Sequence, residues 1–204
     1  MRIDSRRGIL AWTMAWGFTG IALYISGVFN SPRTGPLWVA LIGGAIPWAL
    51  AGALTFRPAA RESSNQLNPA VLLIWALAYL LAFGLAAFAA SALDIALGGF
   101  FFMILGWSIG GAAGAFVSTW LHSDRSKLRR SAGQGVIWLL GFVAGGYAGL
   151  MGLYLGPELG KIFLGSLIGQ PAALTLGAGV GLAPGGLVAS AIAVGVTRLV
   201  TSRP

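Results

Sequence analysis

Charged residues are confined to short segments of this 204-residue chain, and they separate six long uncharged stretches. An ionised side chain at the bilayer midplane costs about 2.5–3.5 kcal/mol, so charges collect at the ends of membrane spans. A helix needs about 20 apolar residues to cross roughly 30 Å of hydrocarbon. Each stretch is between 23 and 36 residues long and therefore holds one crossing. The stretches are residues 8–32, 34–56, 63–93, 95–123, 131–157 and 162–197.

This pattern predicts an all-α, polytopic integral membrane protein with six transmembrane helices in a single membrane domain, residues 1–204. Helices satisfy every backbone group without water, and the period-two alternation of a membrane strand is not visible. Asn68 followed by Pro69 predicts the start of the third helix, because these residues suit the cap and first position. The predicted spans are 8–29, 37–56, 70–90, 98–121, 133–156 and 172–197.

The basic residues predict the orientation of the chain. Of 13 Lys and Arg, all but Arg33 and Lys161 fall at the two ends or in the second and fourth connections. The positive-inside rule then places both termini in the cytoplasm, with the protein in the cytoplasmic (inner) membrane. The fourth connection is the densest basic stretch, and we expect it to contact lipid headgroups or an acidic partner, although topology alone accounts for much of its charge. Its basic residues are Arg125, Lys127, Arg129 and Arg130.

Composition excludes several classes of function. The chain carries a formal charge of +8, but it is 57% hydrophobic and only 9% charged. It therefore lacks the polar surface that a nucleic-acid-binding domain needs. Cysteine is absent and histidine occurs once, which removes the usual metal, haem and thiol sites. No carboxylate falls inside a predicted span. We therefore expect no enzyme activity, no cofactor and no nucleic-acid partner.

Tryptophan spacing predicts an internal repeat. Trp12, Trp75 and Trp138 are separated by 63 residues each, near the start of each odd-numbered helix. Three helical hairpins, at about 1–62, 63–130 and 131–204, would share one orientation around an axis along the membrane normal. The last hairpin is longer than the others, and the extra length matches a predicted outer loop at Pro157–Gly169. The alternative is an aromatic belt, since Trp favours both membrane interfaces.

Small residues recur every four positions in the part of the chain after residue 97, where 23 of the 32 glycines lie. Residues four apart share one helix face, so each row forms a smooth face that lets another backbone approach closely. We expect these rows to be helix-packing surfaces. They are Gly106, Gly110 and Gly114; Gly141, Gly145 and Gly149; and Gly177, Gly181 and Gly185.

Two functions fit these observations. In the first, the protein is a non-catalytic assembly or accessory subunit whose Gly/Ala-rich faces pack against a second copy or a larger membrane complex. In the second, it is a channel or facilitator for a small neutral or lipophilic solute, lined by the glycine rows with Ser108, Thr119 and Gln134. Pro47 and Pro184 would kink two helices and free carbonyl groups for such a path. We favour the first function, because it requires no property beyond the packing that the residues already indicate.

Overall fold

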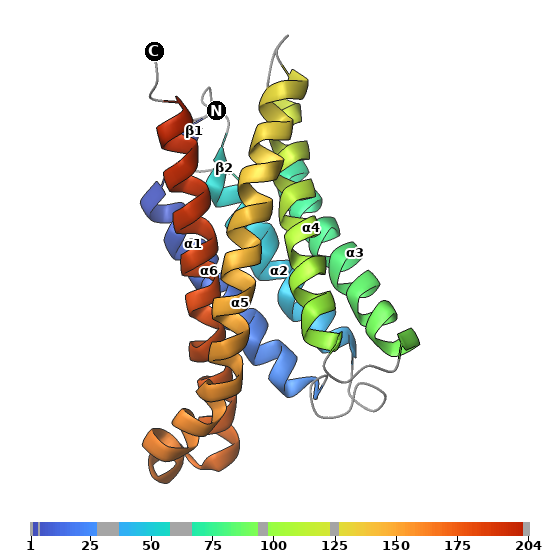
Figure 1. The fold of residues 1–204 in the computed structure, drawn as a ribbon. Helices are drawn as coiled ribbons and strands as arrows, with labels where there is room; N and C mark the ends of the chain where they lie inside the picture. The colour runs from blue at the N-terminus through green and yellow to red at the C-terminus, as the bar shows by residue number, and fades with distance from the viewer. Residues whose placement is uncertain are drawn as a thin grey trace.

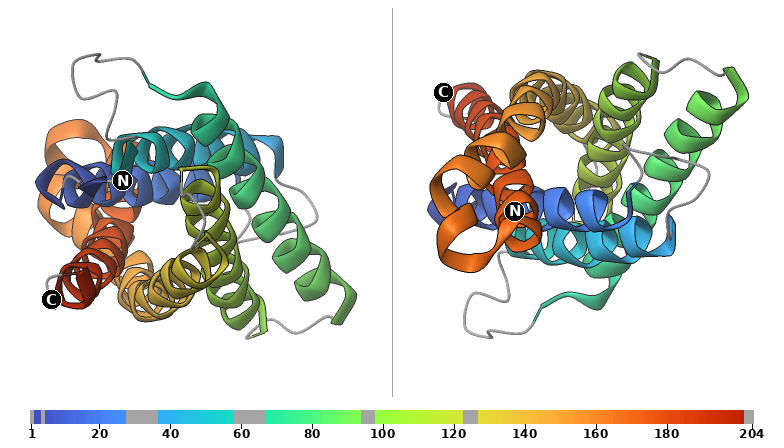
Figure 2. Two further views of the ribbon diagram at one scale, coloured as in Figure 1. Left: turned by 90° about the horizontal axis from the view of Figure 1, so that it is seen from above. Right: turned by 90° about the horizontal axis from the view of Figure 1, so that it is seen from below.

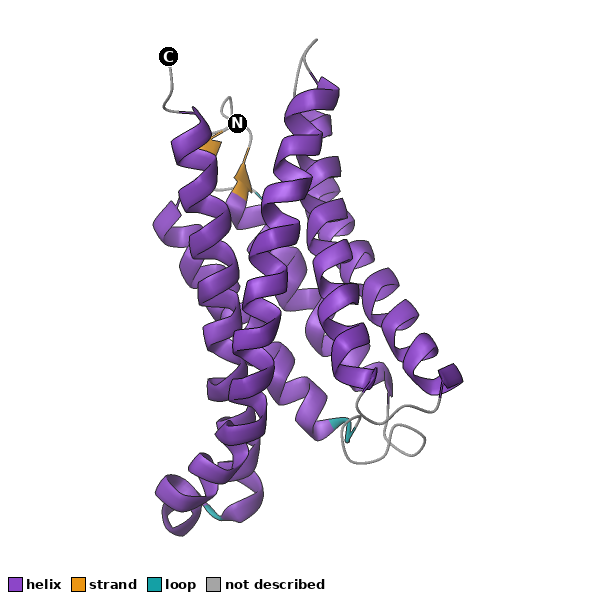
Figure 3. Cartoon of the chain, in the orientation of Figure 1, coloured by secondary structure: helices purple, strands orange, loops and turns teal. Residues whose placement is uncertain are grey.

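The computed structural model describes residues 2–3, 5–27, 37–57, 67–93, 98–122 and 127–201. Within them the chain forms six α-helices, as predicted (Figures 1 and 3). A two-residue strand near the N-terminus, β1 (Arg2–Ile3), pairs antiparallel with β2 (Phe56–Arg57), which directly follows the second helix. The helices are α1 (Ser5–Ile25), α2 (Leu37–Thr55), α3 (Pro69–Leu93), α4 (Gly98–His122), α5 (Lys127–Ile168) and α6 (Gln170–Thr201).

Five of the six helices are long and apolar enough to cross a membrane, namely α1, α2, α4, α5 and α6. The apolar part of α3 that the structure describes is shorter, Pro69–Gly84, although its helix is 25 residues long and continues to Leu93. At the start of α3 the Oδ1 atom of Asn68 accepts a hydrogen bond of 3.0 Å from the N–H of Ala70. The predicted helix start at Asn68 and Pro69 is therefore confirmed.

The helices pack in the order in which they follow along the chain, and the ring closes where α6 packs against α1. Figure 2 shows this arrangement along the bundle axis. Both termini lie at the same end of the bundle, where α2 ends and α5 begins (Figure 1). The described segments that are rich in Arg and Lys therefore share one end, which is the placement that a positive-inside distribution requires.

The last hairpin differs from the predicted one. The segment predicted as an outer loop, Pro157–Gly169, is helical up to Ile168, so α5 is 42 residues long and α6 begins directly after Gly169. Gly169 makes this tight connection with a φ of +83°, a left-handed conformation that glycine adopts without steric cost. The helices also run through Pro47, Pro157 and Pro184. Membrane helices tolerate proline because neighbouring helices and local adjustments satisfy the freed carbonyl groups.

Candidate functional site

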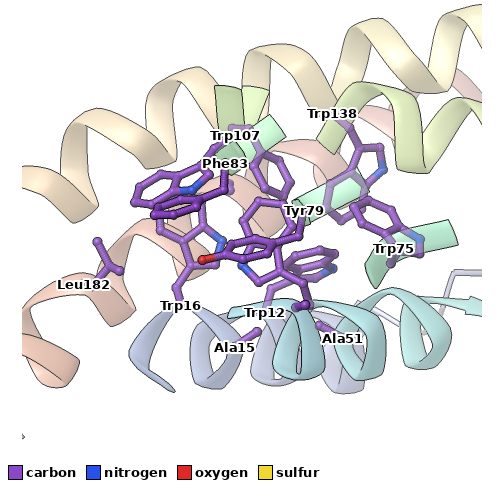
Figure 4. Packing of buried hydrophobic residues seen from close by; sticks show 14 of the residues in the cluster. Trp12, Ala15, Trp16, Ala51, Trp75, Tyr79, Phe83, Trp107, Trp138 and Leu182 are labelled. Atoms are coloured by element: carbon purple, nitrogen blue, oxygen red, sulfur yellow. The ribbon is translucent and has the colours of Figure 1, made fainter. Parts of the chain in front are cut away.

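Aromatic side chains from α1 to α5 and from β2 fill the interior of the ring. None of them is more than 1% exposed. The sixth helix contributes Leu182, which is also fully buried, together with small residues (Figure 4). We call these side chains the aromatic core: Trp12, Trp16, Trp48, Phe56, Trp75, Tyr79, Phe83, Trp107, Trp138 and Phe142.

The three equally spaced tryptophans meet in one layer of this core. The ring centroid of Trp12 lies 4.9 Å from that of Trp75 and 5.4 Å from that of Trp138, and the latter two are 6.0 Å apart. Phe56 lies 5.4 Å from both Trp75 and Trp138. Because all three tryptophans are 0% exposed, they do not face lipid headgroups. The aromatic-belt interpretation is therefore wrong for these residues.

A second layer lies one helical turn further along. The ring of Trp48 lies 5.2 Å from that of Tyr79 and 4.9 Å from that of Phe142, and Trp16 lies 5.0 Å from Trp107. All three pairs are tilted or edge-to-face, and aromatic quadrupoles favour such arrangements over a face-to-face sandwich. Such pairs contribute about 0.5–1.5 kcal/mol each beyond their buried area. The core is thus a dense aromatic stack within the ring.

Two polar groups of the core are paired with neighbouring helices. The Nε1–H of Trp12 donates a hydrogen bond of 3.1 Å to Oγ1 of Thr55, whose hydroxyl donates to the carbonyl oxygen of Ala51. The Tyr79 hydroxyl donates a hydrogen bond of 3.0 Å to the carbonyl oxygen of Ala40 on α2. These bonds fix α1 and α3 against α2.

The other five indole N–H groups of the core have no hydrogen-bond acceptor among the described residues. An unsatisfied buried donor costs about 1–3 kcal/mol. These groups belong to Trp16, Trp48, Trp75, Trp107 and Trp138.

Glycines make room for the large rings. A Cβ atom at Gly114 would lie 2.8 Å from the ring of Trp75, and one at Gly111 would lie 2.7 Å from that of Phe142. Each position can therefore hold no side chain while the ring stays in place. The other glycines in contact with core rings are Gly44 at Tyr79, Gly52 at Trp75, and Gly149 and Gly185 at Trp16.

The predicted glycine row of α5 faces α6. A Cβ atom at Gly141 would lie 2.6 Å from the carbonyl oxygen of Ala189, and one at Gly145 would lie 2.7 Å from the Ala189 Cβ. Gly149 lies against Trp16 and Leu182 instead. The first two positions thus allow the backbones of α5 and α6 to approach closely.

The predicted glycine row of α6 faces α5. Gly177 lies against the backbone of Gly156, and Gly181 against that of Gly152. Gly185 lies against the carbonyl oxygen of Gly145 and the ring of Trp16, so it serves both the helix pair and the core.

The predicted row of α4 faces α3 along its whole length. A Cβ atom at Gly106 would lie 2.6 Å from the carbonyl oxygen of Ala82 on α3, and one at Gly110 would lie 2.8 Å from the Ala82 Cβ. Gly114 faces Trp75. All nine predicted packing glycines therefore contact other parts of this same chain.

The polar residues predicted to line a conduit lie at different levels of α4 and α5. Ser108 is buried, and its hydroxyl donates to the carbonyl oxygen of Ile104 one turn earlier. Thr119 lies 11 residues further along α4, about 16 Å away along the helix. Gln134 accepts a hydrogen bond of 3.3 Å from the Thr197 hydroxyl on α6.

Two of the four basic residues predicted to contact lipid or a partner are described in full. Arg129 and Arg130 are exposed in the first turn of α5, at the end of the bundle where the termini lie. Lys127 begins this helix, whereas Arg125 lies outside the described residues.

An apolar groove lies on the surface of the bundle between α4 and α5, with a cavity of about 170 Å³. Ile104 and Leu150 are buried at its floor, and exposed aromatic and methionine side chains form its walls. The charge and glycine patterns do not predict this groove, although three of its residues recur on α5 at the four- and three-residue spacing of one helix face. We call it the α4–α5 groove, lined by Phe101, Ile104, Tyr147, Leu150, Met151 and Tyr154.

The chemistry that these residues offer is packing and weak hydrogen bonding. Within the described ranges, no three His, Asp or Glu side chains lie close enough to hold a metal ion. Compared with protein-family models, with curated proteins and with solved structures, the chain matches none.

Proposed function

We propose that this protein is a non-catalytic subunit of the cytoplasmic membrane that assembles with a second copy or with another membrane protein. The observation that carries this proposal is the aromatic core, in which ten large side chains pack against one another inside a closed ring of helices. Because the core fills the interior of the bundle, we expect a partner to bind on its outer surface. Its glycine rows support the proposal indirectly, because they hold the ring rigid.

The α4–α5 groove is the surface through which we propose that the partner helix binds. Tyr147 and Met151 are more than half exposed there, beside the buried Ile104 and Leu150. Aromatic and methionine side chains around a pocket are typical of the residues that dominate binding energy at protein interfaces. A transmembrane helix of a partner would bury them without unpairing a polar backbone group.

A site-specific photo-crosslinker tests this surface in intact membranes. Placed at Tyr147, inside the groove, it is expected to give one discrete adduct of fixed mass. Leu140 provides the matched control, since it is exposed on α5 two turns away and does not line the groove. Equal labelling at both positions, or only lipid adducts at Tyr147, would show that the groove faces lipid and would contradict the proposal.

One observation favours a second function, the facilitated passage of a small neutral solute. The indole N–H groups of Trp16, Trp48 and Trp107 lie in the ring interior without an acceptor among the described residues. A solute that accepts hydrogen bonds would find donors there, although the rings must move apart to admit it. Reconstitution into lipid vesicles distinguishes the two functions. Solute-specific permeation above that of empty vesicles would favour the conduit, and permeation equal to theirs is expected for a subunit.

A further inference from the structure

The end of α5 continues beyond the part that packs in the ring. From Arg130 to Glu158 the helix covers 28 residues, or about 42 Å, which already equals the thickness of a bilayer with its headgroups. On α6 the same number of residues separates Arg198 from Gln170. The segment between these two outer positions therefore lies at the membrane surface farthest from the termini. We call it the distal tip, residues 159–168.

The distal tip has little contact with the rest of the molecule. Gly160 is the last α5 glycine whose backbone lies against α6, next to Ala173 and Gly177. Beyond it, Ile162 and Phe163 are 69% and 70% exposed. Figure 1 shows that this end of α5 turns away from the direction of the bundle. The tip thus presents apolar side chains that no other described residue of the chain covers.

Most of the apolar side chains of the tip gather on one helix face. Leu159, Ile162, Phe163 and Leu167 follow the spacing of one apolar helix face and are all at least half exposed. Lys161 and Gly165 fall on the opposite face by the same period of 3.6 residues, with Ile168 beside them, and Ser166 falls within the apolar face. An apolar face beside a short polar one is characteristic of a helix that lies in the plane of a membrane interface.

We propose that the distal tip lies in the headgroup region of the bilayer, with its apolar face directed into the acyl chains. Continuity supports lipid as the occupant: the exposed side chains of Leu155 on α5 and of Leu176 and Val180 on α6, which do not line the α4–α5 groove, lead towards the tip. In water a straight extension would expose Phe163 and Leu167, which would lose the favourable free energy of burying an apolar side chain. This placement is independent of the proposed function.

The natural absence of cysteine makes the test direct, because a single introduced cysteine carries the only label. An environment-sensitive fluorophore is attached to Phe163→Cys and, as the matched control on the polar face, to Lys161→Cys. A third label at Val180→Cys, which is exposed within α6, gives the reference emission and quenching of a label inside the hydrocarbon core. The protein is reconstituted at high dilution into vesicles of phosphatidylethanolamine and phosphatidylglycerol, with or without lipids that carry a nitroxide near the ester carbonyl.

The label at Phe163→Cys is expected to emit at shorter wavelength than that at Lys161→Cys. The nitroxide lipid should quench it several-fold more strongly, and aqueous iodide several-fold less. If both labels respond alike to iodide, the tip stands in water and the proposal is wrong. If the Phe163→Cys label is shielded from iodide and from the nitroxide lipid together, protein covers the tip and the proposal is equally wrong. Unchanged thermal unfolding of the variants excludes a folding defect as the cause.

Discussion

At the scale of single residues, glycine decides how closely two membrane helices approach. Apolar burial gives little advantage between helices in lipid, so dispersion contact between backbones takes its place. Gly145 illustrates this, because it lies against the backbone of Gly185 and the Cβ of Ala189. Gly195 is a helical glycine of the same bundle, and nothing lies within 4 Å of the position that a Cβ atom would occupy there. The two positions thus separate the packing role of glycine from its low helix propensity.

Gly145→Ala is therefore expected to lower the free energy of unfolding by about 1–3 kcal/mol, the usual cost of overpacking. Gly195→Ala should leave it unchanged or raise it by up to about 1 kcal/mol, because alanine favours the helix. Gly145→Leu and Gly110→Leu should be more severe. Unfolding of the purified protein in mixed detergent micelles measures the difference. Equal stability of Gly145→Ala and Gly195→Ala would show that the α5–α6 contact is not tight.

A second prediction concerns the hydrogen bond from Trp12 to Thr55. Thr55→Val keeps the shape of the side chain but removes the acceptor of the buried indole N–H, so we expect a loss of about 1–3 kcal/mol. Thr175→Val is the matched control, because that hydroxyl is exposed and bonds only to the carbonyl oxygen of Pro171 in its own helix. The same unfolding measurement applies. A Thr55→Val protein as stable as the Thr175→Val protein would contradict the prediction.

At the scale of elements, the connection between α5 and α6 depends on one backbone conformation. Gly169 has a φ of +83°, with nothing within 4 Å of the position that a Cβ would occupy. Gly169→Ala should therefore cost about 1 kcal/mol through backbone strain alone. Gly133→Ala, at an equally open position without a positive φ, should cost nothing. If the two variants have the same free energy of unfolding, the turn adopts another conformation in the folded protein.

The elements also show how far sequence reasoning reaches. The spacing of charges predicted six helices, because the cost of ions in hydrocarbon depends on composition and not on tertiary contacts. It failed at Pro157–Gly169, which was predicted as an outer loop between two spans, whereas Gly156 and Gly160 pack against α6 and the chain stays helical. The role of Trp75 could not be predicted either. Its burial depends on Gly52 and Gly114, which lie far away in the sequence.

For the whole molecule, the packing order of the helices bears on the proposed repeat. Three hairpins around an axis along the membrane normal would form a closed ring, and the helices pack in such a ring. Trp12, Trp75 and Trp138 meet at its centre in one layer. The repeat remains a prediction about ancestry, but this geometry gives the three tryptophans one shared structural role. A ring filled by such a core is held together from within, which is why its outer surface is the place to look for partners.

The orientation of the whole molecule gives the last prediction. The orientation predicted by the positive-inside rule, with both termini in the cytoplasm, would place Gln170, at the opposite end of the bundle, on the far side of the membrane. A membrane-impermeant maleimide should therefore label Gln170→Cys in intact cells, and Leu199→Cys only after lysis. Both positions are exposed, so accessibility within the protein is matched. The reverse pattern would place the basic end outside the cell. Because the basic residues of the termini and of α5 share one end, such a result would overturn the positive-inside argument for all of them together.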